Sequence, residues 1–338
     1  MDRFSRLLAG LLGRAARLLP GRRREWARLR WPNRARSPAA GFPARSRPAP
    51  GSVPAMMGGV PPHQATHEVT VDAGRGVVVK RYRSWSRGEP AREWVALTLL
   101  AEFAPGLAPA PLRASLQADP PEIVMSFVRG TVPGARVTPH DADALGVALD
   151  RLWGSVPRTR LAPAFGTEPM PTAFARRVRS MAGSARAVPD GPLARQALSA
   201  GTAWLASAAL GRRPAADEDA VLGQGAVLGQ GDGNLANFLW NGGQVRIVDF
   251  EDSGPSDRAF ELAVLVEHLS AWPGARLDTG PFLARFRLTG PEKARLTECR
   301  RLLALFWLLM LLPGGPASTR NPPGTLDLQA SRLLTLLG

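Results

Sequence analysis

The apolar positions between residues 67 and 130 alternate at first and then recur at helical spacing. In HEVTVDAGRGVVVKRY (67–82), alternating and β-branched residues lie on both sides of a turn at Asp72 to Gly76, which predicts a β-hairpin. EPAREWVALTLLAEFA (89–104) has apolar residues at helical spacing, and PEIVMSFVRG (121–130) is typical of a buried strand that ends at a glycine. We therefore expect a small sheet with one helix.

From Asp141 onward the apolar pattern is mostly helical. The predicted helices are DADALGVALDRLW (141–153), PTAFARRVRSMA (171–182), LARQALSAGTAWLASAAL (193–210), DRAFELAVLVEHLSAW (257–272) and a run that ends at Leu312. Only the stretch VLGQGDGNLANFLWNGGQVRIVDFED (227–252) predicts a clear hairpin among them. The pattern indicates an α+β protein with two lobes, a small β-rich lobe over 63–128 and a large helical lobe over 129–338.

Residues 1–62 form a basic leader. At about 100° per residue, the apolar side chains of residues 3–19 share one face of a helix and four arginines share the other, which is typical of a segment that lies on an anionic membrane surface. Residues 21–62, rich in Arg, Pro and Gly, indicate a disordered linker. Two interpretations stay open: a weak membrane contact through residues 1–20, and an upstream start with little structure before Met56.

The net charge of +15 by itself suggests a nucleic-acid or membrane partner. However, residues 1–66 hold 13 arginines and two acids, so most of the charge lies in the leader and predicts no specific nucleic-acid partner for the folded part. The single cysteine, Cys299, excludes an internal disulfide and fits a reducing, cytoplasmic environment as a buried apolar residue. The longest apolar run, 302–312, is too short to span a bilayer, and we expect a buried helix there.

Three polar residues surround the predicted hairpin of the large lobe. Asn241-Gly242-Gly243 predicts a tight turn, because Asn and Gly tolerate positive φ. Folding about residue 243 brings Asn237 and Asp249 almost opposite each other, with Asp232 in the preceding loop. Two oxygen ligands and a nearby carboxylate are a suitable set for holding Mg²⁺ beside an attacking group.

This stretch resembles the catalytic loop and metal-binding strand of the aminoglycoside phosphotransferase and choline kinase-like family, which has a protein-kinase-like fold. The family pattern is His-Gly-Asp, four residues, Asn, a short hairpin and Ile-Asp. The resemblance implies that Asp232 orients or deprotonates the acceptor hydroxyl and that Asn237 and Asp249 bind Mg²⁺. Gln230 stands where the family usually has His. Because that His mainly supports the loop, we expect Gln230 to supply hydrogen bonds instead.

The sequence of the predicted small lobe extends the same resemblance. A kinase-like fold needs a strand Lys for the α- and β-phosphates and a helix Glu that holds it, and Lys80 and Glu93 stand in that order. Lys80 is one of only two lysines in a chain with 41 arginines, and its compact ammonium suits a tight phosphate site. Ser126, Phe127 and Val128 follow the buried strand as the expected adenine-binding segment.

Several acidic and glycine residues have simpler structural explanations. Gly74 and Gly76 indicate a turn more than a phosphate cradle, and Glu93 taken alone is typical of a solvated helix face. Glu251 and Asp252 could line a pocket for a cationic substrate. For Asp257 and Glu261 we favour structural roles, Asp257 as a helix N-cap. Asp217 to Asp219 suit an exposed loop, and the tandem VLGQGA/VLGQGD leaves open which copy pairs in a sheet.

Three functional hypotheses follow, and nucleic-acid binding through the Arg-rich tail ranks last because the tail has no folded motif. The first is an ATP- and Mg²⁺-dependent phosphotransferase that acts on a hydroxyl of a small molecule. The second is a catalytically weak or inactive nucleotide-binding protein that acts through interaction, which Gln230 favours and the intact Asp232, Asn237 and Asp249 oppose. The resemblance does not identify the acceptor.

Overall fold

The computed structural model describes residues 67–338, apart from 167, 186–188, 190 and 209–224. The leader, the loop Asp217 to Asp219 and residues 221–224 of the first tandem copy therefore lie outside the described residues. The compact unit that contains the described residues runs from Pro61 to Gly338.

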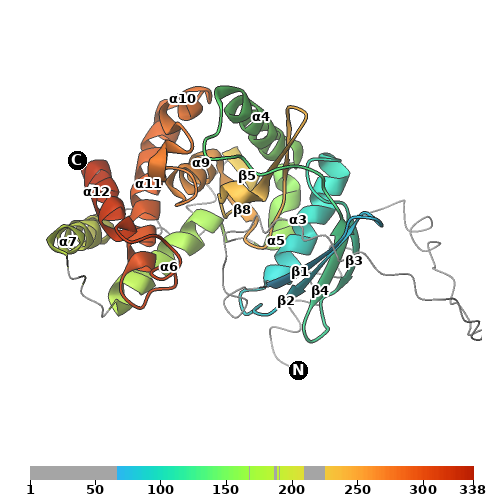
Figure 1. Cartoon of the computed structure of the whole chain (residues 1–338), viewed down its shortest axis with the longest axis horizontal. Helices are drawn as coiled ribbons and strands as arrows, with labels where there is room; N and C mark the ends of the chain where they lie inside the picture. The colour runs from blue at the N-terminus through green and yellow to red at the C-terminus, as the bar shows by residue number, and fades with distance from the viewer. Residues whose placement is uncertain (1–66, 167, 186–188, 190, 209–224) are drawn as a thin grey trace, which may run out of the picture. The chain divides into compact units, whose positions relative to one another are not determined.

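A four-stranded antiparallel sheet with the order β1-β2-β4-β3 forms the small lobe (Figure 1). The strands are β1 (His67–Asp72), β2 (Val77–Tyr82), β3 (Pro111–Ser115) and β4 (Glu122–Ser126). The predicted hairpin is confirmed, and Gly74 and Gly76 lie in its turn, where Gly76 has φ 66°. Strand β3 was not predicted.

Helix α3 (Glu89–Phe103) packs on β3 and β4 beside the sheet. The predicted helix is confirmed, and it buries an apolar stripe that includes Leu97 and Leu100. Lys80 pairs with Val69 on one side and with Ile123 on the other. Directly paired residues of antiparallel strands point to the same face, so Lys80 and Ile123 lie on the face that α3 covers.

The rest of the described chain is mainly helical, as the sequence predicts. Its helices of ten residues or more are α4 (Pro139–Ser155), α6 (Met170–Ser184), α7 (Pro192–Ser207), α9 (Arg258–Glu267), α11 (Gly290–Leu311) and α12 (Thr325–Leu337). Helix α12 was not predicted, nor were the short α5 (Leu161–Phe165) and α10 (Thr279–Ala284). Among the described residues, no helix is long and apolar enough to cross a membrane.

The helical lobe contains two short β-ladders. Strands β6 (Phe238–Asn241) and β7 (Gln244–Ile247) form the predicted hairpin about Gly242 and Gly243, which both have positive φ. Its centre lies between these two glycines and not at residue 243, so Val248, rather than Asp249, faces Asn237 and donates its N–H to the Asn237 carbonyl. Strands β5 (Ala226–Gly229) and β8 (Gly254–Asp257) form the second ladder, which was not predicted.

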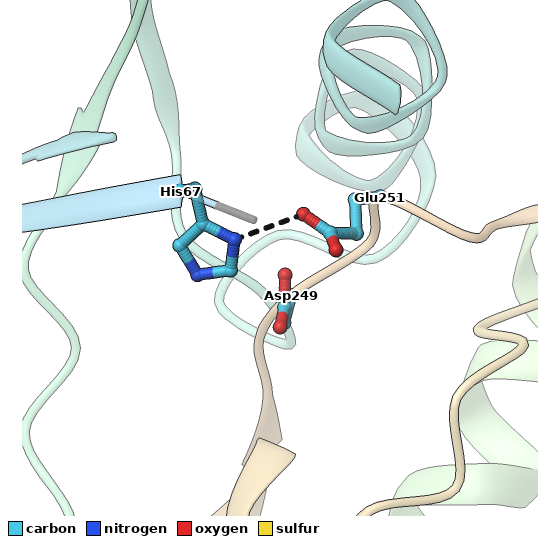
Figure 2. Close-up of side chains that lie close together, drawn as sticks. All are labelled: His67, Asp249 and Glu251. Carbon is cyan, nitrogen blue, oxygen red and sulfur yellow. Dashed lines mark ion pairs between the residues drawn. The ribbon is translucent and has the colours of Figure 1, made fainter. Parts of the chain in front are cut away.

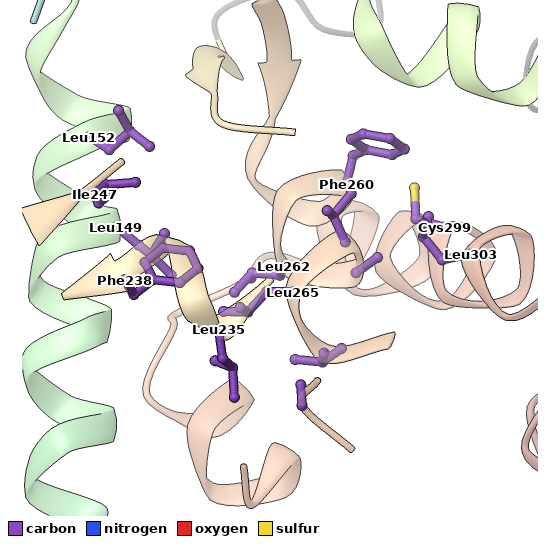
Figure 3. Packing of buried hydrophobic residues seen from close by; sticks show 14 of the residues in the cluster. Leu149, Leu152, Leu235, Phe238, Ile247, Phe260, Leu262, Leu265, Cys299 and Leu303 are labelled. Atoms are coloured by element: carbon purple, nitrogen blue, oxygen red, sulfur yellow. The ribbon is translucent and has the colours of Figure 1, made fainter. Parts of the chain in front are cut away.

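Helix α9 lies in the centre of the core and packs closely along α11 (Figure 3). Each residue from Ala259 to Glu267 is buried, whereas the predicted helix continued to residue 272. Asp257 is the N-cap of α9, as predicted, and its side chain accepts the Phe260 N–H. Cys299 on α11 is fully buried, as predicted. The apolar run 302–312 belongs almost entirely to α11, and all of it except the half-buried Trp307 and Met310 is buried, as expected.

Candidate functional site

Lys80 connects the small sheet to the loop that follows β7. Its Nζ lies 2.7 Å from Glu93 Oε2, 2.5 Å from Asp249 Oδ1 and 2.9 Å from Glu251 Oε2. Lys80 is buried, and burial alone would lower its pKa, but the carboxylates of Glu93 and Asp249 together raise the pKa well above its usual value. The ammonium is therefore charged at every physiological pH.

His67 and Glu251 complete this cluster, and sequence reasoning missed both contacts. Figure 2 shows the His67 imidazole facing the Glu251 carboxylate, with Asp249 below the two residues in this view. His67 Nδ1 lies 3.1 Å from Glu251 Oε2. His67 pairs with Tyr82, two positions from the Val69–Lys80 pair, so the strand alternation puts it on the Lys80 face once the hairpin register is known. Tyr82 donates a hydrogen bond to Glu93 Oε2.

The charges of the cluster suit a divalent cation. Glu93, Asp249 and Glu251 bring three negative charges around the single charge of Lys80. His67, Asp249 and Glu251 also offer ligand atoms that lie within 4.8 Å of one another. An excess of buried negative charge is costly without a counter-ion. Carboxylate oxygens are the ligands that Mg²⁺ prefers, so the residues present fit a metal.

Asp232 and Asn237 lie together in the loop between β5 and β6. The Asn237 side-chain amide donates to Asp232 Oδ2 at 2.6 Å. Burial, followed by the nearby charges of Asp249 and Asp252, raises the pKa of Asp232 to about 7. A carboxyl group with its pKa near neutrality can accept a proton from an acceptor hydroxyl.

Gln230 ties this loop to the strand end that carries Asp249. Its Nε2 donates to the Asp249 carbonyl at 2.8 Å, and its Oε1 accepts the N–H groups of Asp232 and Gly233 at 3.0 and 3.1 Å. Gln230 is 2 % exposed. The expectation that it supplies hydrogen bonds is confirmed.

Helix α9 holds the same loop from the other side. Glu261 accepts the N–H groups of Gln230 and Gly231 at 2.9 and 3.2 Å, and its other oxygen accepts the Ser256 hydroxyl at 2.7 Å. Gly233 has φ 67°, and a Cβ there would lie 2.5 Å from the Val264 carbonyl oxygen. The close contact between loop and helix therefore requires glycine. The structural role expected for Glu261 is confirmed.

Residues 63–297, more than half of the chain, match the sequence profile of the phosphotransferase enzyme family. The chain belongs to this family. A search of curated proteins finds no match.

Solved structures share the fold of this phosphotransferase at low identity. A choline/ethanolamine kinase family protein from Mesorhizobium loti is 19 % identical, with a TM-score of 0.52 over 81 % of this chain and 85 % of that one. Aminoglycoside phosphotransferase APH(4)-Ia is 14 % identical, with a TM-score of 0.52 over 80 % and 88 %. Choline kinase LicA from Streptococcus pneumoniae is 14 % identical, with a TM-score of 0.51 over 80 % and 89 %. The kinase-like, two-lobed α+β fold expected from the sequence is confirmed.

The phosphotransferase exposes apolar side chains on the Lys80 face of its small sheet. Val69 and Val71 are 42 % and 50 % exposed, and they pair with Lys80 and Val78. The two valines are two positions apart, so both lie on the face of β1 that carries the pairing with Lys80 and Val78.

The expected adenine-binding segment stands at the end of β4. Phe127 donates its N–H to the Gly76 carbonyl, and Ser126 donates to the Ala110 carbonyl, so neither group is available to a base. Val128 is buried. The Ser126 hydroxyl accepts the Ala110 N–H at 2.8 Å.

Most of the predicted site residues converge in the structure. Lys80, Glu93 and Asp249 meet directly, and Asp232 meets Asn237. Glu93 is 1 % exposed and is not a solvated helix residue. Asp252, considered for a cationic pocket, instead pairs with Arg87 at 2.9 Å.

Proposed function

We propose that this protein transfers the γ-phosphate of ATP to a hydroxyl group of a small molecule, with Mg²⁺ as cofactor. The observation that carries the proposal is the meeting of Lys80, from the small sheet, with Asp249, one residue past the strand partner of Asn237. A phosphate-binding cation, an oxygen-ligand pair and a carboxyl group with its pKa near 7 are the parts that phosphoryl transfer needs.

In this proposal Lys80 holds the α- and β-phosphates, and Glu93 keeps its ammonium in place at 2.7 Å. Asn237 and Asp249 hold Mg²⁺, which neutralises charge on the phosphates when bound. The adenine lies against Val69 and Val71 and reaches the segment Ser126 to Val128. APH(4)-Ia, a similar fold, has been solved as a ternary complex with ADP and hygromycin B.

Asp232 acts on the acceptor. Its carboxylate accepts the proton of the hydroxyl as the hydroxyl oxygen bonds to the γ-phosphorus, and the bond from that phosphorus to the bridging oxygen of ADP breaks. Asn237 holds Asp232 Oδ2 at 2.6 Å and leaves Oδ1 for the acceptor. Gln230 keeps the loop rigid, which argues for an active enzyme over the inactive alternative.

The first test is the thermal stability of the purified protein with and without Mg·ATP. We expect a rise in Tm for the wild type, because a ligand that binds only the folded state stabilises it. The rise should shrink in Asp249→Asn and persist in Asp143→Asn, whose side chain is 75 % exposed on α4. No rise with ATP or GTP in a folded sample would contradict nucleotide binding.

The second test asks for turnover. Hydroxylated small molecules are screened as acceptors by following ADP release, with Asp232→Asn as the inactive control. Nucleotide binding without ADP release from any acceptor or from water would favour the inactive, interaction-based alternative.

A further inference from the structure

His268 lies next to the loop that carries Asp232. It follows α9 directly, is 9 % exposed, and packs edge-on against Trp307 with ring centroids 4.8 Å apart. Its Nδ1 accepts the Ser270 N–H at 3.0 Å and lies 2.7 Å from Ser270 Oγ. Because Nδ1 is an acceptor, the ring proton is on Nε2.

Ser270 fixes this arrangement to the catalytic loop. Its Oγ accepts the Leu235 N–H at 2.9 Å, three residues after Asp232. The Ser270 hydroxyl is thereby oriented toward the His268 ring. Ser270 holds the imidazole at Nδ1, and Trp307 packs against it with its ring plane at 90°, so the direction of Nε2 is set by the fold.

The Nε2–H of His268 faces the reactive side of Asp232. Nε2 lies 3.8 Å from Asp232 Oδ1, while Asn237 occupies Oδ2. A separation of 3.8 Å is too long for a direct hydrogen bond, yet one oxygen atom can lie within about 3 Å of both atoms. Asp232 is 34 % exposed at its side chain, so such an oxygen can enter from outside.

We propose that His268 binds the acceptor: its Nε2–H donates to the acceptor oxygen while the acceptor hydroxyl donates its proton to Asp232 Oδ1. This inference rests on the proposed phosphotransfer. It accounts for each valence of the hydroxyl oxygen, since the hydrogen faces Asp232, one lone pair faces His268 and the other is left to attack the γ-phosphorus.

The arrangement also selects the class of acceptor. A neutral amine has two hydrogens and one lone pair, so with one hydrogen on Asp232 and its lone pair on the phosphorus, its second hydrogen would face the His268 N–H. Two donors that face each other destabilise the complex. Burial lowers the pKa of His268 to about 3, so the ring stays neutral and adds no charge that would favour an anionic acceptor. The site therefore takes alcohols in preference to amines.

Three variants separate acceptor binding from structural support. His268→Gln places an amide N–H at about the reach of Nε2 but loses the contact with Ser270. His268→Asn places its amide near the Nδ1 position and keeps a partner for Ser270, but does not reach the acceptor. His268→Leu lacks both, and His140→Leu, at a side chain that is 78 % exposed, is the control.

Turnover of ATP is measured with an alcohol acceptor from the screen, or with water where no alcohol reacts, and Kd for Mg·ATP is measured in parallel. We expect kcat to fall about tenfold in His268→Leu and His268→Asn, the effect of one lost hydrogen bond, and to recover to within about threefold in His268→Gln. Kd for Mg·ATP should not change, because His268 lies on the acceptor side of Asp232.

Recovery in His268→Asn but not in His268→Gln would show that the residue only supports Ser270, and would overturn the inference. Wild-type kcat in all three variants, or a parallel loss of Mg·ATP affinity, would overturn it as well. If His268→Leu does not fold, the comparison of the Gln and Asn variants decides alone. A wild type that binds no Mg·ATP, or binds it without turnover, counts against the proposed function itself.

Discussion

Glu261 provides a test of how α9 holds the loop between β5 and β6. Its buried carboxyl accepts two backbone N–H groups, from Gln230 and Gly231, and the Ser256 hydroxyl. Burial outweighs these hydrogen bonds and raises the pKa of Glu261 from 4.5 to about 7. In Glu261→Gln, the amide oxygen can accept the same two N–H groups, and the amide nitrogen can donate to Ser256 Oγ, so the variant resembles the protonated acid without its titration.

The sign of the effect follows from proton binding. Between pH 4.5 and 7 the folded protein keeps a proton on Glu261 that the unfolded chain has lost, so raising the pH lowers the free energy of unfolding. At about 1.4 kcal/mol for each pH unit, the loss from this group is about 3 kcal/mol and is complete above pH 7. Relative to the wild type, Glu261→Gln should therefore gain about 2–3 kcal/mol of stability between pH 5 and pH 8.

The assay is urea unfolding of both proteins at pH 5 and pH 8. The change in wild-type free energy of unfolding with pH is not informative alone, because His268 also contributes to it. Burial lowers the pKa of His268 to about 3, so this residue destabilises the fold as the pH falls below 6.5, which is opposite in sign to the effect of Glu261. The difference between variant and wild type removes this contribution. Glu68→Gln, at a side chain that is 53 % exposed, is the control. An equal difference at the two pH values would refute the reasoning.

Three further substitutions test the cluster, the loop and the core. Lys80→Met should abolish the Mg·ATP shift in Tm and lower the Tm of the free protein, since it leaves three carboxylates without their cation, whereas Lys293→Met should change neither. Gly233→Ala should lower both Tm and turnover, because its φ of 67° and the Val264 carbonyl leave no room for a Cβ; Gly134→Ala, in open space, is the comparison. Glu267→Ala should cost about 3–5 kcal/mol in urea unfolding, since it leaves Arg300 and Arg332 without their fully buried partner, and a loss under 1 kcal/mol would contradict this.

The fold was largely predictable because long apolar patterns dominate it. The first hairpin, α3 and the major helices follow periods that the sequence displays directly. Strands β3 and β8 were missed for a physical reason: PLRAS and GPSD have no β-branched residues and each contains a proline, and they pair only because a buried neighbour strand supplies the ladder. The domain boundaries at 62 and 128 stay a prediction.

The candidate site was predictable only where one motif carries several residues. Asp232, Asn237 and Asp249 lie within one short stretch, and Lys80 is conspicuous in an arginine-rich chain. His67 could not be found in this way, because its contact with Glu251 depends on the sheet register and on the path of the chain after β7. A single histidine at a strand end gives no signal of its own.

Helix α9 illustrates how such a site depends on the core. At its first turn Glu261 binds the start of the loop between β5 and β6. Further along, the Val264 carbonyl lies against Gly233, and directly after the helix ends His268 faces Asp232. Residues Ala259 to Glu267 of α9 are all buried, so close packing fixes the position of the helix in the core. The three contacts in turn fix the position of the loop relative to α9. RAFELAVLVEH has the pattern of an ordinary core helix, and its contribution to the site becomes visible only when the loop is placed against it. A substitution that shifts α9 should therefore lower turnover before it lowers nucleotide affinity, because Lys80 and the Val69 face belong to the small sheet.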